Sequence, residues 1–325
     1  MTHERQLPDP GAGSSPHSAP LSGVNATPPA GGLRTRSDRG DRDRTRPSAP
    51  EPLPVAVYDN HTHLEFEDGV DVLDPLDSLA RAEAVGVRGV VQVGTDLETS
   101  RWGAQLAAAD PRVLAAVALH PNEAPRLAER GLLSEHLSEI SRLATHPRVR
   151  AVGETGLDFF RTGEDGREAQ LESFEAHIEI AKANDIALQI HDRDAHDAVV
   201  ATLLRVGAPQ RTVFHCFSGD ADLARICAEH GWYLSFAGTM TFKNAPALRE
   251  ALTVADPARV LVETDAPFLT PEPFRGRPNA PYLLPHTVRR MAEVLGTPLD
   301  ELCAQLAANT EAVYGSWAMD QEAAA

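Results

Sequence analysis

The chain has 325 residues, 42% of them hydrophobic, and a formal net charge of −17, a size that allows one large domain or two ordinary ones. Residues 1–54 hold seven arginines and six acidic residues, which leaves about −18 on the rest and disfavours a protein that coats nucleic acid. With no apolar run of roughly eighteen residues, no secretory signal and only three cysteines, we expect a cytoplasmic protein with no membrane partner.

The first 54 residues contain ten prolines and a charged tract from Arg34 to Arg46. Such a segment buries too little apolar surface to order itself, so residues 1–54 are predicted to be a disordered tail. Residues 319–325 are predicted to be a flexible C-terminus.

From Val55 onward, short β-branched runs alternate with longer stretches of helical periodicity, a pattern typical of repeated βα units. Eight strands are predicted, at Val55–Asn60, Gly86–Gly94, Val113–His120, Val149–Glu154, Ile186–His191, Thr212–Cys216, Trp232–Phe236 and Val260–Asp265. The predicted helices are Pro75–Ala84, Leu97–Ala109, Glu168–Asn184, Ala195–Val206, Asp220–Glu229, Ala245–Val254, His286–Leu295 and Pro298–Tyr314. Eight such units favour a single (β/α)8 TIM barrel over residues 55–318, with a doubly wound open sheet as the alternative.

Metal-competent side chains fall at the carboxyl ends of the predicted strands, where barrel enzymes build their sites. Two histidines spaced i, i+2 on an extended segment point the same way and can chelate one ion. Any one of these residues alone also fits a structural role, but their shared position predicts a metal site. The candidate ligands are His61, His63, Glu154, His191, His215 and Asp265.

Four histidines and two carboxylates offer mixed nitrogen and oxygen ligation suited to Zn, Mg or Mn. One ion cannot use all six comfortably, whereas two divalent ions roughly 3.5–4 Å apart can, with one carboxylate bridging them and a hydroxide between them. In some two-metal barrels a carbamylated lysine is the bridge. The only lysines here are Lys182, in a predicted helix, and Lys243, after the seventh strand. Glu154 is therefore the expected bridge.

Seven motifs in this order resemble those of the TatD family of metal-dependent hydrolases, within the amidohydrolase-like barrels. They are DNHTHL (59–64), ALHP (118–121), GETGLDFF (153–160), IHDRDA (190–195), FHCFSG (214–219), YLSFAG (233–238) and LVETDAPFLTP (261–271). The resemblance runs from about Val55 to Tyr314. It implies that His61, His63 and Asp265 hold one ion. It also implies that His191 and His215 hold the other and that Glu154 bridges the two.

The resemblance further implies phosphodiester hydrolysis, typically of DNA, by a hydroxide that two metal ions activate. Asp265 is then the candidate general base or proton shuttle, and Asp59 or Glu263 is expected to orient histidine ligands. Ala280 stands where the family usually shows a glutamate, which leaves the metal ligands intact but affects a loop expected near the substrate. The candidate substrate residues are Arg193, His120, Arg275 and Arg277.

An acidic exterior with a small basic mouth favours single-stranded DNA ends as the partner, cleaved by a monomer with 3'-5' exonuclease-like action. The same hydroxide also suits an ester or amide, including the aminoacyl ester of a tRNA. A third alternative is a non-catalytic barrel that keeps its metal as structure. Turnover of a substrate panel separates the first two alternatives, and metal without turnover identifies the third.

Overall fold

The computed structural model describes residues 33–36 and 42–318. Residues 1–32 of the predicted tail and the predicted flexible C-terminus at 319–325 lie outside the described residues. The strands of the main sheet are β2 (Val57–Thr62), β4 (Val87–Val93), β5 (Val113–Val117), β6 (Val149–Asp158), β7 (Ala187–Arg193), β8 (Thr212–Phe214), β9 (Tyr233–Phe236) and β10 (Val260–Val262). The helices are α1 (Pro75–Ala84), α2 (Leu97–Ala109), α3 (Ala124–Glu129), α4 (Leu133–Leu143), α5 (Glu164–Asn184), α6 (His196–Val206), α7 (Ala221–Glu229), α8 (Pro246–Val254), α9 (Leu284–Leu295) and α10 (Leu299–Tyr314).

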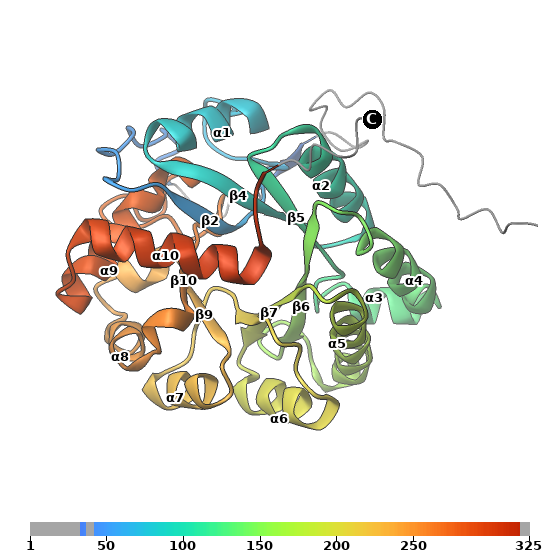
Figure 1. Cartoon of the computed structure of the whole chain (residues 1–325). Coiled ribbons are helices and arrows are strands. Elements are labelled where there is room, and N and C mark those ends of the chain that lie inside the picture. The colour runs from blue at the N-terminus through green and yellow to red at the C-terminus, as the bar shows by residue number, and fades with distance from the viewer. Residues whose placement is uncertain (1–32, 37–41, 319–325) are drawn as a thin grey trace, which may run out of the picture.

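All eight strands are parallel and follow the order β10–β9–β8–β7–β6–β5–β4–β2. The first and last strands are joined where Thr62, the last residue of β2, forms a parallel bridge with Ala266, beyond the end of β10. The Asp265 amide donates to His61 O (2.9 Å) and the His63 amide to Ala266 O (2.8 Å). These bonds close the sheet into a ring with helices around it (Figure 1). The predicted (β/α)8 barrel is confirmed, and the open-sheet alternative is excluded.

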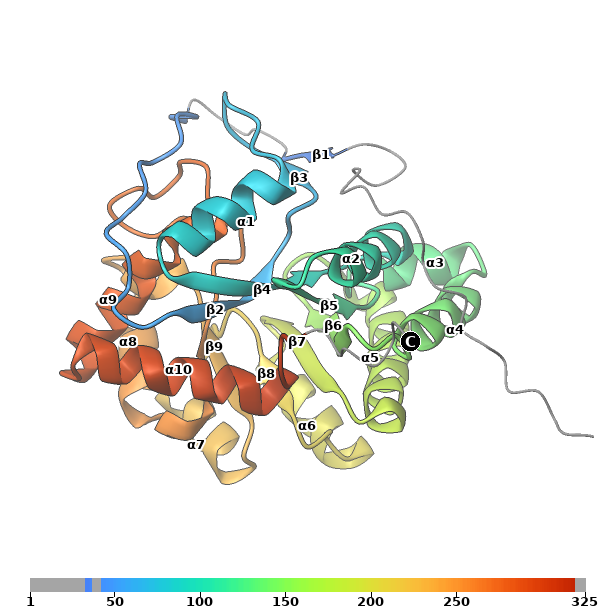
Figure 2. The same cartoon turned by 45° about the horizontal axis from the view of Figure 1, so that its top comes forward.

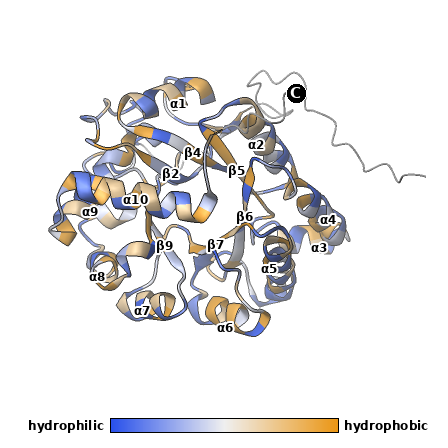
Figure 3. Ribbon diagram, in the orientation of Figure 1, coloured by the Kyte–Doolittle hydropathy of each residue, from blue (hydrophilic) through white to orange (hydrophobic). Residues whose placement is uncertain are grey.

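The strands are buried on both faces, as expected for a parallel sheet covered by helices. On β4, Val90 packs outward in the cluster that includes the helices, while Val91 and Val93 pack in the cluster inside the ring. The inner cluster also holds Tyr314 from α10 and Trp317 just beyond it. Helix α10 therefore closes the end where the strands begin. The surrounding helices carry both hydrophobic and hydrophilic residues (Figure 3).

Several element boundaries differ from the prediction. Strands β6 and β7 continue past their apolar parts. In this extension Gly156 pairs with His191, and Asp158 pairs with Arg193. Apolar patterning cannot reveal such a polar extension. Helices α3 and α4 were not predicted, and α3 is too short, at six residues, to show a helical period. Among the described residues no helix is both long and apolar enough to span a lipid bilayer.

The prediction that residues 1–54 are disordered is wrong for the residues of this segment that the structure describes. Residues 33–36 and 42–54, here called the arm, lie against the barrel. Strand β1 (Arg34–Thr35) pairs in parallel with β3 (Phe66–Glu67), as Figure 2 shows. Farther along, Tyr282 donates its hydroxyl hydrogen to Pro47 O (2.6 Å). Composition misses this contact because the partners lie on distant loops of the barrel.

Helix α5 is fastened to the segment after β5 by a buried neutral histidine. His177 Nε2 accepts from the Leu119 amide (3.1 Å), and its Nδ1 lies 2.6 Å from Ser173 O. Burial lowers the pKa of His177 to about 4, against an ordinary value of 6.5. Because the folded state then binds fewer protons than the unfolded state between these values, the free energy of unfolding falls as pH drops through this window.

We expect His177 to remove about 3 kcal/mol from the free energy of unfolding between pH 7 and pH 4. Urea unfolding of the wild type and of His177→Gln across this range checks it. A glutamine amide can both accept and donate here but does not titrate. The free energy of unfolding of the wild type should therefore fall, relative to that of His177→Gln, as the pH is lowered from 7 to 4. A pH-independent difference would show that His177 is not the titrating group.

Candidate metal centre

The six predicted ligands converge at one end of the barrel. His61 lies in β2 and His63 just beyond it, Glu154 lies in β6 and His191 in β7. His215 directly follows β8, and Asp265 follows β10. Because all strands are parallel, their carboxyl ends gather on one face, which brings side chains distant in sequence together.

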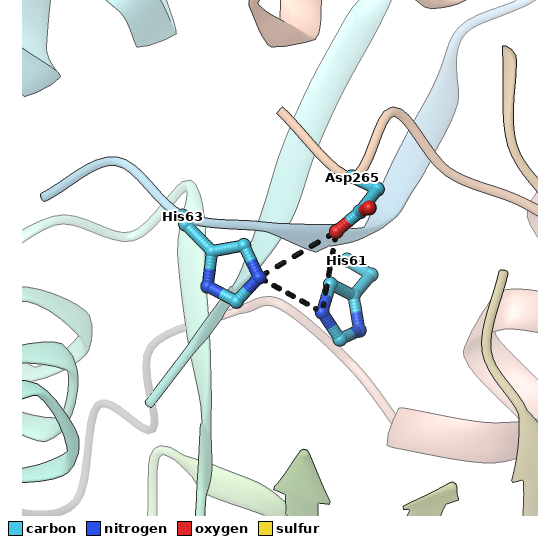
Figure 4. Close-up of side chains that lie close together, drawn as sticks. All are labelled: His61, His63 and Asp265. Carbon is cyan, nitrogen blue, oxygen red and sulfur yellow. Dashed lines mark hydrogen bonds and ion pairs between the residues drawn. The ribbon is translucent and has the colours of Figure 1, made fainter. Parts of the chain in front are cut away.

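The first group joins His61, His63 and Asp265 (Figure 4). The two Nε2 atoms lie 3.2 Å apart, and Asp265 Oδ1 is 3.8 Å from His61 Nε2 and 3.5 Å from His63 Nε2. His63 Nδ1 lies 3.0 Å from Val93 O, so in the neutral ring this nitrogen carries the hydrogen and Nε2 offers a lone pair. Two imidazole nitrogens and a carboxylate oxygen converging in this way fit a divalent cation.

The second group surrounds one oxygen of Glu154. Its Oε1 lies 2.7 Å from His191 Nδ1, 2.9 Å from His215 Nε2 and 3.5 Å from His120 Nε2. Its Oε2 faces the first group instead, 3.7 Å from His61 Nε2. The two oxygens of one buried carboxylate therefore address two separate sets of histidines, which is the arrangement a bridging ligand requires.

Further carboxylates hold two of these histidine rings. Glu263 Oε1 lies 3.1 Å from His215 Nδ1 and accepts from the Cys216 amide at 2.7 Å. Asp158 Oδ2 lies 3.3 Å from His191 Nε2. Asp59, the other residue expected to orient a histidine ring, instead accepts from the Thr264 amide (2.9 Å). Glu263 thus meets the expected contact, whereas Asp59 binds both the backbone amide and the side-chain hydroxyl of Thr264.

Burial and neighbouring charges shift the pKa values of Glu154 and Cys216. Burial alone would raise the pKa of Glu154, but the neighbouring His215 and His120 lower it well below its usual range, so the carboxylate is ionised. Burial and the nearby Asp265 raise the pKa of Cys216 well above its usual range. Its sulfur therefore stays a thiol and is a poor nucleophile.

The candidate ligands line a cavity of about 610 Å³, except for His61, which is fully buried beneath it. Two of the predicted substrate residues, His120 and Arg193, lie on its wall. The guanidinium carbon of Arg193 stacks 3.9 Å from the ring centroid of the exposed Phe160. Both residues are thus placed where a bound molecule can meet them.

The other two predicted substrate residues do not line this cavity. Arg275 stacks over Phe242, with 4.2 Å between its guanidinium carbon and the ring centroid. Arg277 donates through Nε to Thr45 O (2.9 Å), which fastens the arm. Contact of these two arginines with a substrate therefore stays a prediction, from outside this cavity. The sequence places both in the right loop but does not show which way the side chains turn.

Several residues that line the cavity are not predicted from the sequence, among them Asn122, Asp158, Arg161 and Arg36. Asp158 had a usable signal, because it follows Glu154 by four residues on one strand and thus lies on the same face. Arg36 had none, since it comes from the segment predicted to be disordered.

Comparisons with known proteins agree with this geometry. The family model described as TatD related DNase matches residues 58–315. The metal-dependent hydrolase TatD of Mycobacterium tuberculosis is 43% identical over 263 residues, which cover 80% of this chain and 98% of the relative. The 3'-5' ssDNA/RNA exonuclease TatD of Citrobacter rodentium is 34% identical over 75% of this chain and 93% of its own length.

Among solved structures, the TatD homologue YjjV of Escherichia coli K12 matches with a TM-score of 0.71 at 28% identity. The match covers 79% of this chain and 97% of YjjV. Because the family match spans the barrel from β2 through α10, this chain belongs to the TatD-related family and is a metal-dependent hydrolase.

Proposed function

We propose that the protein is a phosphodiesterase that binds two divalent ions and degrades single-stranded nucleic acid from an end, with 3'-5' exonuclease-like action. The observation that carries this proposal is the position of Glu154, whose two oxygens face two separate groups of histidines. His61, His63 and Asp265 would hold one ion, His191 and His215 the other, and Glu154 both. Imidazole nitrogens favour Zn over Mg and Mn, which prefer oxygen ligands.

When bound, the two ions acidify a water molecule and stabilise the negative charge that develops on phosphoryl oxygens. The chain itself supplies the remaining functions. Asp265 lies beside both histidines of the first group and on the cavity wall, so its carboxylate is placed to take up a proton. Arg161 and Arg193 provide guanidinium groups that match phosphate oxygens.

The substrate class is supported by charge and by a relative. The chain carries a net charge of −17, which repels a duplex over most of the surface. The cavity lining combines five acidic residues, among them the ligand candidates Glu154 and Asp265, with three arginines that can contact phosphates. A single strand that enters the cavity by its end can contact those arginines. The Citrobacter rodentium relative is named a 3'-5' ssDNA/RNA exonuclease, which agrees with the proposed direction of attack.

The test combines metal analysis with turnover of a chromogenic phosphodiester, single-stranded DNA, closed circular duplex DNA and an aminoacyl ester. We expect the wild type to hold about two ions per chain and to degrade the single strand far faster than the closed circle. Turnover of the aminoacyl ester alone would instead favour an ester hydrolase. Bound metal without turnover of any substrate would favour a non-catalytic barrel.

The variant Asp265→Asn should lower kcat on single-stranded DNA by about 100-fold, because proton transfer by a positioned carboxylate contributes on this scale. Initial rates at saturating substrate check this. The matched control is Asp222→Asn, in which the same change is made to a side chain that is 87% exposed on α7. Equal rates for the wild type and Asp265→Asn would remove Asp265 from the reaction.

A further inference from the structure

The arm brings an arginine to the cavity from outside the barrel. In the pairing of β1 with β3, the Arg34 amide donates to Glu65 O (2.8 Å) and the Arg36 amide to Glu67 O (3.1 Å). The family match begins at residue 58, so the arm lies outside the matched residues. Whatever Arg36 does is therefore a property of this chain that the family match does not supply.

A buried carboxylate anchors the arm. The side chain of Asp68 is 1% exposed, and its carboxylate receives Arg36 Nη1 (3.1 Å to Oδ2) together with the guanidinium of Arg42. Arg46 donates through Nε to Asp71 O (2.9 Å) and through Nη2 to Asp68 O. A buried acid shared by two arginines holds the arm in one position but leaves Arg36 only partly neutralised.

The Arg36 guanidinium is placed at the cavity edge. Its Nη1 also donates to Pro267 O (2.7 Å), two residues after the ligand candidate Asp265. Its guanidinium carbon lies 5.3 Å from the ring centroid of Phe268, whose ring is 6.1 Å from that of His63. Within the described part of the chain, its side-chain hydrogen bonds all use Nη1, so Nε and Nη2 keep donors for a ligand.

We propose that Arg36 binds a phosphate of the substrate strand that neighbours the scissile phosphate. This inference rests on the proposed nuclease function and adds a phosphate-binding subsite to it. The side chain lines the cavity and is 23% exposed, so it is held by the protein yet open to a ligand. A guanidinium offers two parallel donors to phosphate oxygens, and here Pro267 and Phe268 restrict its motion before substrate arrives.

The test compares Arg36→Ala with Arg44→Ala in the full chain. Arg44 is on the same arm and has the same charge, but it donates to Gly69 O (3.1 Å) and does not line the cavity. The substrates are a single-stranded oligodeoxynucleotide and bis(4-nitrophenyl) phosphate, which has no neighbouring phosphate. We expect Arg36→Ala to raise KM for the oligonucleotide about tenfold, with kcat within about twofold, because one charge-assisted contact is lost.

Further measurements distinguish a lost phosphate contact from other effects of the substitution. The salt dependence of oligonucleotide binding to the chelator-treated protein should decrease by roughly 0.7 in logarithmic slope, as expected for one lost phosphate contact. Hydrolysis of the small diester should stay unchanged in Arg36→Ala. Arg36→Lys, which keeps the charge without the fork, should give an intermediate KM, and thermal unfolding of each variant verifies the fold.

The outcomes separate this inference from the function on which it rests. A wild type that cleaves neither substrate would overturn the proposed function and the subsite with it. A wild type that cleaves both, with Arg36→Ala unchanged, would overturn only the subsite. Equal increases in KM for Arg36→Ala and Arg44→Ala would show that the loss of a positive charge on the arm, and not a specific contact, weakens binding. Equal losses of activity on both substrates would show instead that Arg36 supports the metal centre.

Discussion

The Glu154→Gln variant is expected to lose at least about 1000-fold in kcat/KM on single-stranded DNA, because in the proposed centre several kcal/mol of charge stabilisation depends on Glu154 holding both ions. The amide replaces an anionic oxygen that lies between His191 and His215, at 2.7 and 2.9 Å. It should also hold fewer ions per chain after dialysis. Elemental analysis and initial rates on the same preparations measure both quantities.

The control for this variant is Glu229→Gln, the same change at an exposed position near the end of α7. It should match the wild type in metal content and in rate. Thermal unfolding of chelator-treated Glu154→Gln verifies that its fold persists. Full metal content with a rate within about tenfold of the wild type would contradict a bridging role for Glu154.

The Gly156→Ala variant is expected to lose at least about 3 kcal/mol of unfolding free energy and most of its activity. Gly156 has φ +135°, and a Cβ there would lie 2.1 Å from the carbonyl oxygen of His191. These two residues pair in the β6–β7 ladder, so the only relief is to move the strand that carries a metal ligand. Urea unfolding followed by circular dichroism, with rates measured in parallel, checks this expectation.

Gly131→Ala measures what an alanine costs in the ordinary left-handed region when no close contact is added. Gly131 also has a positive φ, +66°, but no heavy atom of the described residues comes within 4 Å of its added Cβ. Its replacement should cost only about 1 kcal/mol, the strain of a left-handed alanine. If both variants lost the same free energy, the close approach to His191 would not be the reason for glycine at position 156.

The sequence predicts the barrel and the positions of the ligand candidates well, for a physical reason. Buried parallel strands read as short apolar runs, and metal-competent residues at the ends of several such runs together predict one shared site. The alternation of side chains puts His61 and His63 on one side without any long-range information. The carboxyl ends of parallel strands then gather the rest, including Glu154, in any closed barrel.

The substrate wall is predicted poorly, because it depends on loops and on which way long side chains turn. Arg275 and Arg277 lie in the expected loop, yet the first stacks on Phe242 and the second binds the arm. Arg36 comes from a segment whose composition indicates disorder, and it is ordered by the buried Asp68 of a distant loop. Neither the acceptor nor its burial can be read from local pattern.

The closure of the barrel would give the proposed metal centre a second role. The first and last strands are joined beyond their ends by amides of His63 and Asp265, residues whose side chains are also ligand candidates. Opening this seam would separate the donors of the first ion, and an ion that binds only the closed ring stabilises it by RT ln(1 + [ion]/Kd). A low concentration of the ion would then lower the stability of the closed barrel as well as the rate of the reaction. The barrel would open at the seam between the first and eighth strands.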